Sequence, residues 1–108
     1  MNKYTVEFSR RANMQLRNIF SYIAQDNTTA ALKMIDLLEA SAMRLEITPF
    51  IGVELPKDEY PMLTEGYRML VVRAFNLYYR VVDNTIYITH IIHHRRNQTA
   101  TLKEGEHE

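Results

Sequence analysis

The side chains best suited to chemistry gather in the last third of the chain, where arginines, histidines and tyrosines alternate with aliphatic residues. Histidine transfers protons near neutral pH, and the arginine fork binds two oxygens of one phosphate or carboxylate group. Because every second side chain of a strand lies on the same face, we predict that Arg80 and His93 share one open face of a sheet. Tyr78 and Tyr87 belong to that face and are suited to stacking on a nucleic-acid base. Arg95 continues the face if the strand extends that far.

The position of Arg68 depends on the length of the loop around residues 73–74. A two-residue loop buries Leu70 and turns Arg68 toward the core, whereas a three-residue loop places Arg68 beside Arg80. We predict the three-residue loop, because an unpaired buried arginine is costly. With that loop, His93, Arg80 and Arg68 form one candidate catalytic set.

Each of these residues also has a purely structural interpretation. Arg80 can lie over the Tyr87 ring as a cross-strand cation–π pair, and His93 can cap the end of its strand. A metal site is not expected, because His90 and His93 point to opposite faces of a strand. His90 and His94 share a face but lie about 13 Å apart at ~3.3 Å per residue, whereas two zinc ligands must both come within ~2.1 Å of the metal. We expect no cofactor.

Hydrophobic periodicity predicts the elements that position these residues. Residues 3–8 alternate between apolar and polar side chains, which indicates a strand buried on one side. Helical periodicity follows from Arg10 to about Gln25 and again from about Thr28 to Ile47, and the short break between these helices makes them an antiparallel hairpin. Residues 49–66 contain all three prolines and predict a loop, with a short strand near Val53.

Three strands, over residues 67–72, 75–82 and 85–93, are predicted from their Val, Ile, Tyr and Leu content. A two-residue turn at Asp83-Asn84 pairs Val82 with Thr85, Arg80 with Tyr87, and Tyr78 with Thr89. The predicted core face contains Phe75, Leu77, Tyr79, Val81, Ile86, Ile88 and Ile92. The predicted open face contains Asn76, Tyr78, Arg80, Tyr87, Thr89, Ile91 and His93.

The expected fold is therefore α+β: an N-terminal strand, an antiparallel helical hairpin and a three-stranded antiparallel meander, in one sheet with the helices on one face. A single domain over residues 1–97 is predicted, followed by a polar tail over 98–108 that frays.

Composition limits the classes of function. The chain has 108 residues, 13 Lys and Arg against 13 Asp and Glu, and no cysteine. Zero net charge excludes a basic nucleic-acid coat, and the missing cysteines exclude disulfides and thiolate zinc sites. No apolar run is long enough for a signal peptide or a membrane span, so we expect a cytoplasmic protein.

The zero net charge conceals a strong asymmetry along the chain. Residues 67–103 contain six basic residues against Asp83 alone, whereas residues 51–66 contain Lys57 against four acids. A basic site in the meander is therefore compatible with a neutral chain.

Four patches of sequence stand in a distinctive order. They are the turn Pro49-Phe50-Ile51-Gly52, the strand Tyr67-Arg68-Met69-Leu70-Val71, the strand Asn76-Leu77-Tyr78-Tyr79-Arg80-Val81-Val82-Asp83, and the ending Ile91-Ile92-His93-His94-Arg95-Arg96-Asn97. With the strand–helix–helix–meander order, this set resembles the RelE/ParE toxin superfamily of bacterial type II toxin–antitoxin systems over about residues 3–97. The family's closing pattern usually has Asp where this chain has Asn97. The Pro-x-x-Gly turn and the His-x-Arg-Arg ending are more similar to the ParE branch.

The resemblance implies a toxin that arrests growth and is neutralised by a cognate antitoxin in a hetero-oligomer. ParE-like members poison DNA gyrase, whereas RelE-like members cut messenger RNA on the ribosome. We expect the gyrase inhibitor, because the acids around Lys57 would repel RNA. The first alternative is a metal-independent mRNA interferase, and the second is an inactive relative that only binds its antitoxin.

The resemblance also suggests roles for individual residues. In the interferase alternative, His93, Arg80 and Arg68 are catalytic. The expected nucleic-acid or target-binding residues are Arg95, Arg96, Tyr78, Tyr87 and His94.

Overall fold

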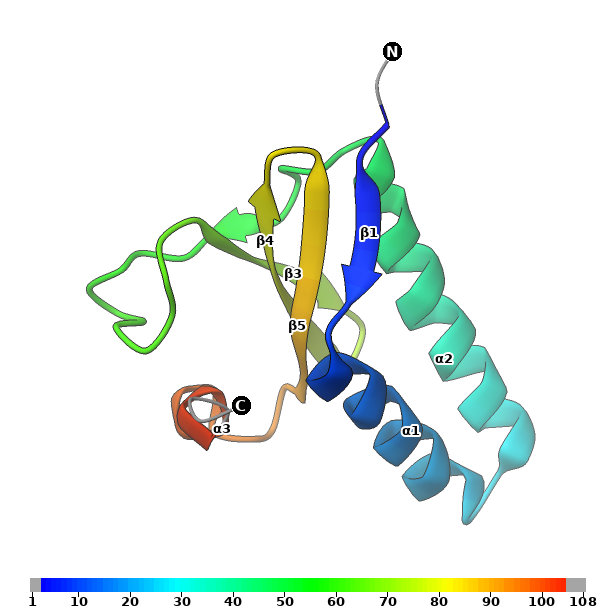
Figure 1. Cartoon of the computed structure of the whole chain (residues 1–108). Helices are drawn as coiled ribbons and strands as arrows, with labels where there is room; N and C mark the ends of the chain where they lie inside the picture. Colours follow the sequence, from blue (N-terminus) through cyan, green and yellow to red (C-terminus); the bar gives the residue numbers. More distant parts are fainter. Residues whose placement is uncertain (1–2, 105–108) are drawn as a thin grey trace.

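The protein is described here by a computed structural model that covers residues 3–104. Five strands form one mixed sheet in the order β1-β5-β4-β3-β2 (Figure 1). The strands are β1 (Thr5–Phe8), β2 (Val53–Glu54), β3 (Tyr67–Val72), β4 (Phe75–Val82) and β5 (Thr85–His93). β1 runs parallel to β5, and the other neighbours are antiparallel. The predicted α+β fold is confirmed, and the three meander strands have the predicted ends.

The helical hairpin consists of α1 (Arg10–Ala24) and α2 (Thr28–Met43), followed by a 3-10 turn, η1 (Arg44–Glu46). Each helix begins where a side-chain oxygen accepts a free backbone N–H: Ser9 Oγ from Ala12 at 3.0 Å, and Asn27 Oδ1 from Ala30 at 2.9 Å. The hairpin covers one face of the sheet (Figure 1). The main core between them contains Ala12, Leu16, Leu38, Ala42, Leu45, Leu77, Tyr79, Ile86 and Ile88.

A β-bulge in β5 changes which side chains face the helices. The predicted pairs Val82–Thr85 and Arg80–Tyr87 are confirmed. The predicted pair Tyr78–Thr89 is wrong, because Tyr79 pairs with Ile88 while Tyr78 pairs with His90. Thr89 is therefore an extra residue without a partner on β4, and the alternation of β5 reverses after it.

The reversal puts Ile91 and His93 on the face that the helices cover, and His90 and Ile92 on the other face. The bulge lies where β1 ends, since the last β1–β5 pair is Phe8–Ile88. Beyond this point α1 replaces β1 as the neighbour of β5. Ser9 Oγ donates to the Thr89 carbonyl at 3.3 Å, and Gln15 Oε1 accepts from the Ile91 N–H at 2.6 Å.

The second face of the sheet is also partly covered. The loop between β2 and β3 and a third helix, α3 (Gln98–Glu104), lie on the side away from the hairpin (Figure 1). They enclose a second, smaller core, which contains Leu55, Leu63, Tyr67, Tyr78, Ile92 and Leu102.

The prediction of a frayed tail is wrong for residues 98–104. Asn97 Oδ1 accepts from the Ala100 N–H at 2.9 Å and so caps α3, and Thr101 and Leu102 are buried. The helix forms because Tyr78 and Ile92 leave an apolar surface that needs a cover. Residues 105–108 of the predicted tail lie outside the described residues. Within residues 3–104, no helix is long and apolar enough to cross a membrane.

Candidate functional site

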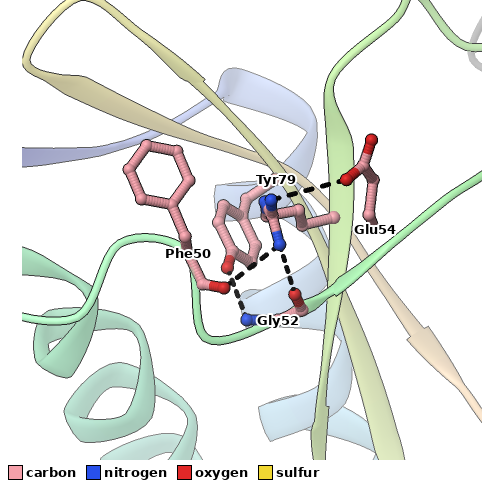
Figure 2. Close-up of polar contacts among 5 residues, drawn as sticks. Phe50, Gly52, Glu54 and Tyr79 are labelled. Carbon is pink, nitrogen blue, oxygen red and sulfur yellow. Dashed lines mark hydrogen bonds and ion pairs between the residues drawn. The ribbon is translucent and has the colours of Figure 1, made fainter.

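Arg68 of β3 binds the loop before β2 and holds it against the sheet (Figure 2). Its Nη1 donates to the carbonyls of Phe50 at 3.1 Å and Gly52 at 2.9 Å, and its Nη2 lies 3.6 Å from Glu54 Oε2. Its guanidinium also lies 5.2 Å from the centre of the Phe50 ring. The guanidinium therefore has two carbonyls, a carboxylate and an aromatic ring as partners, all from residues 50–54.

The predicted three-residue loop before β4 is wrong. Val72 pairs with Phe75, so the loop has two residues, and Arg68 pairs with Tyr79 on the helix side. Arg73 adopts a positive φ of 54° in this turn, although it is not a glycine. A two-residue loop was expected to leave Arg68 buried and unpaired. This cost does not arise, because the carbonyls of Phe50 and Gly52 accept hydrogen bonds from the guanidinium.

Gly52 packs directly against Tyr79. The Tyr79 hydroxyl accepts from the Gly52 N–H at 2.9 Å, and a Cβ on residue 52 would lie 2.7 Å from that oxygen. Burial raises the pKa of Tyr79, and the bond from Gly52 opposes this rise. The Pro-x-x-Gly turn of the sequence thus has a structural role.

Arg80 lies on the opposite face of the sheet, 6.0 Å from the Tyr87 ring centre, which confirms the cation–π alternative. Its other cross-strand neighbour is Tyr67. On this face a recess of about 470 Å³ is lined by Ser9, Arg10, Arg11, Tyr67 and Thr89.

His93 does not share a face with Arg80, because the bulge turns it toward α1. Its ring packs edge-on against Phe75 at 5.2 Å, and its Nδ1 accepts from the Arg95 N–H at 3.0 Å. The capping alternative for His93 is therefore observed. Arg68 and His93 pair with residues 79 and 75 of β4, about 13 Å apart along that strand.

The other predicted binding residues are also distributed over separate places. Tyr78 is fully buried and donates to Gln98 Oε1 at 2.6 Å, and burial raises its pKa to about 12. It is not available for stacking, whereas Tyr87 is half-buried beneath Arg80. Arg96 lies 3.8 Å from Glu104.

His94 and Lys57 lie apart from these residues and from each other. His94 is exposed at the sheet end, where its N–H donates to the Ala74 carbonyl at 2.8 Å. Lys57 donates to the carbonyls of Pro61 at 3.2 Å and of Leu63, and so closes its own loop.

Sequence reasoning missed a buried polar chain around His90. Because a guanidinium only donates, the 2.8 Å contact with Arg11 Nη1 makes His90 Nε2 an acceptor and leaves the ring proton on Nδ1. Nδ1 then donates to Thr89 Oγ1 at 2.9 Å, and that hydroxyl donates to the Tyr78 carbonyl at 3.4 Å. Burial, with a further contribution from the Arg11 charge, lowers the pKa of His90 to about 4.

The geometry does not assemble a phosphoryl-transfer centre from the predicted set. Such chemistry needs a base, an acid and a cation around one phosphate. Here Arg68 faces the 50–54 segment, His93 faces α1, and Arg80 lies on the other side of the sheet. Among residues 3–104, no group of three or more His, Asp or Glu side chains is placed to hold a metal ion.

A strand, a helical hairpin and an antiparallel meander in one sheet define the fold of the RelE/ParE superfamily toxins. Residues 6–98 match the family described as "ParE toxin of type II toxin-antitoxin system, parDE", and the chain belongs to this family. A solved structure described as "Chromosomal ParDE TA system from P. aeruginosa" shares the fold, with a TM-score of 0.68 at 21% sequence identity. The similarity covers 84% of this chain and 96% of that chain. No curated protein sequence matches the chain.

Proposed function

We propose that this protein arrests bacterial growth in the cytoplasm by inhibiting DNA gyrase, and that a cognate antitoxin neutralises it in a hetero-oligomer. Membership of the ParE toxin family supports the toxin role. Gyrase is the target that the resemblance to the ParE branch implies. The printed description of the similar structure, a ParDE system, supports an antitoxin partner for this chain.

The observation that carries the proposal is the separation of Arg68, Arg80 and His93. Each has a structural contact of its own: two loop carbonyls, the Tyr87 ring, and the Arg95 N–H. Ribonuclease chemistry would need all three around one phosphate. A binding inhibitor needs only a surface, and the basic meander supplies one without catalytic groups.

The hydrogen bonds that Lys57 forms within its own loop also support gyrase, and not the ribosome, as the target. A nuclease that docks on ribosomal RNA gains affinity from free cations. Lys57 is the only base among residues 51–66, and it is bound to two carbonyls of its own loop beside Asp58 and Glu59.

The test is expression from a tightly repressed promoter, combined with an assay of purified gyrase. We expect growth arrest, double-strand DNA breaks with an SOS response, intact messages, and loss of supercoiling activity when the purified protein is added. Co-expression of the protein encoded by the adjacent reading frame should restore growth. Arg80→Ala serves as the diagnostic variant, since it removes the half-buried arginine that a nuclease would use.

Two outcomes would overturn the proposal. Ribosome-dependent message cleavage that disappears in Arg80→Ala would identify an mRNA interferase. Normal growth at high expression, with the antitoxin still bound, would identify an inactive relative.

A further inference from the structure

A cleft of about 380 Å³ lies between the second half of α1 and the ends of β4 and β5. Figure 1 shows that α1 continues past the lower end of the sheet. Its apolar lining is Ile19, Tyr22, Ile23 and Phe75, and its polar lining is Asn18, His93 and Arg95. Tyr22 is 76% exposed, a high value for so large an aromatic side chain. The volume suits one large side chain and its polar neighbour.

His93 is held in one orientation at this cleft. The edge-on contact with Phe75 fixes the ring plane, and the Arg95 N–H occupies Nδ1. The His93 carbonyl accepts from Gln98 Nε2 at 2.8 Å, which fixes the backbone behind the ring. In the neutral ring the proton therefore lies on Nε2, and this N–H has no acceptor among residues 3–104. The cleft therefore contains an oriented hydrogen-bond donor, the Nε2 N–H of His93, next to apolar side chains.

Arg95 is the only charged side chain among the residues that line the cleft, apart from the titratable ring of His93. Within the part of the chain that the structure describes, no carboxylate forms an ion pair with Arg95. α1 contains no acidic residue, and the nearest acid in the sequence, Asp26, follows Ile23 by three residues and does not line the cleft. The unpaired guanidinium of Arg95 therefore favours an anion at this cleft.

We propose that this cleft binds a carboxylate that is carried on an apolar body, presented by a protein partner as an acidic residue next to a large hydrophobic one. The apolar body packs against Ile19, Ile23 and Phe75, while the carboxylate accepts hydrogen bonds from His93 Nε2 and the Arg95 guanidinium. A nucleic-acid phosphate fits less well, because its sugar neighbours offer no apolar surface to these walls. Binding at this cleft does not depend on the proposed inhibition of gyrase, because gyrase takes no part in it.

The experiment uses the whole chain, labelled with ¹⁵N and ¹³C, and small probes observed by NMR. The probe is 3-phenylpropionate, which has an aromatic ring two carbons from a carboxylate. The matched controls are 3-phenylpropan-1-ol, which keeps the body without the charge, and acetate, which keeps the charge without the body. Inorganic phosphate tests for a general anion site.

We expect 3-phenylpropionate to shift the His93 ring nitrogens and the methyl groups of Ile19 and Ile23 in a saturable manner. The alcohol and acetate should each bind about tenfold more weakly, as the loss of a charge-assisted hydrogen bond or of the apolar contact predicts. Arg95→Gln should weaken the carboxylate probe by a similar factor without changing binding of the alcohol. Lys103→Gln removes the same charge from α3 and should leave both affinities unchanged.

Three results would overturn the proposal. One is equal affinity for the alcohol and the carboxylate, which would mean an apolar cleft without anion recognition. Another is tighter binding of inorganic phosphate at the same signals, which would indicate a nucleic-acid contact. The third is the absence of any shift at His93 up to millimolar probe. His93→Phe keeps an aromatic ring against Phe75 and removes the donor, so it should weaken binding of the carboxylate probe. If the His93→Phe chain does not fold, Arg95→Gln still tests the site, because Arg95 is exposed and its substitution should not disturb the core.

Discussion

The Tyr79 hydroxyl lies 2.9 Å from the Gly52 nitrogen and fills the space that a side chain at residue 52 would need. Beside it, Arg68 binds the carbonyl of the same glycine (Figure 2). One glycine therefore donates to a tyrosine of β4 and accepts from an arginine of β3. This pair of bonds joins the loop after α2 to the middle of the sheet.

Gly52→Ala should destabilise the fold. The new Cβ would lie 2.7 Å from Tyr79 Oη and 3.0 Å from the Met69 carbonyl, and the second atom is backbone. Overpacking of this kind costs about 1–3 kcal/mol, measured as a lower urea midpoint with an unchanged slope. Gly66→Ala is the control, because a Cβ there has open space and suffers only from a φ of +87°. A smaller loss at Gly52 than at Gly66 would contradict the packing argument.

Arg68→Lys should lower stability although it keeps the charge. A lysine ammonium cannot repeat the fork that reaches the Phe50 and Gly52 carbonyls while it lies over the Phe50 ring. We expect a loss of about 1–2 kcal/mol in the free energy of unfolding, with faster proteolysis near residue 50. Glu54→Gln should change little, because that carboxylate is 72% exposed. A larger effect from Glu54→Gln would make the ion pair the main contact.

Leu102→Ala should show that α3 is part of the fold. Leu102 is 3% exposed and packs in the core that covers Tyr78 and Ile92. Its truncation should cost about 2–3 kcal/mol, read from thermal unfolding, and should increase hydrogen exchange on the face of β4 that α3 covers. Leu32→Ala, at a 53% exposed position on α2, is the control and should change stability by only a few tenths of a kcal/mol. Equal effects of the two substitutions would mean that α3 does not contribute.

The sequence predicted what depends on local patterns. The ends of the three meander strands and the pair Arg80–Tyr87 follow from alternation and from the turn at Asp83-Asn84, and both are confirmed. The pairing prediction holds only up to Thr89. The bulge there depends on where β1 ends and α1 begins, which is a tertiary event that β5 alone does not encode.

The candidate site was predicted less well for the same reason. A single extra residue in β5 moves His93 to the other face of the sheet and so separates it from Arg80. The register of Arg68 was judged by the cost of an unpaired charge, but its partners are carbonyls of the 50–52 turn, and the sequence does not show that this turn packs beside β3. The helix α3 is short and polar, and its stability comes from Leu102 packing on a surface formed far away in the chain.

The buried His90 should make stability depend on pH. Burial and the charge of Arg11 lower its pKa from 6.5 to about 4 in the folded state, where the Tyr78 ring and Thr89 also face it. Between these values the unfolded chain binds more protons than the folded one, so stability is lost as the pH falls below 6.5. The contribution of His90 to this loss amounts to about 2 kcal/mol between pH 7 and pH 5.

The measurement is urea unfolding of the parent chain and of His90→Gln at pH 7 and pH 5. His90→Gln removes the titrating ring and keeps an acceptor for Arg11, although it should lower stability at pH 7 because the bond to Thr89 is disturbed. Its stability should then fall less than that of the parent on acidification, since the remaining carboxylates and histidines are common to both chains. Parallel pH profiles for the two proteins would mean that His90 has the same pKa in the folded and the unfolded chain, as it would if Arg11 moved away on protonation at little cost.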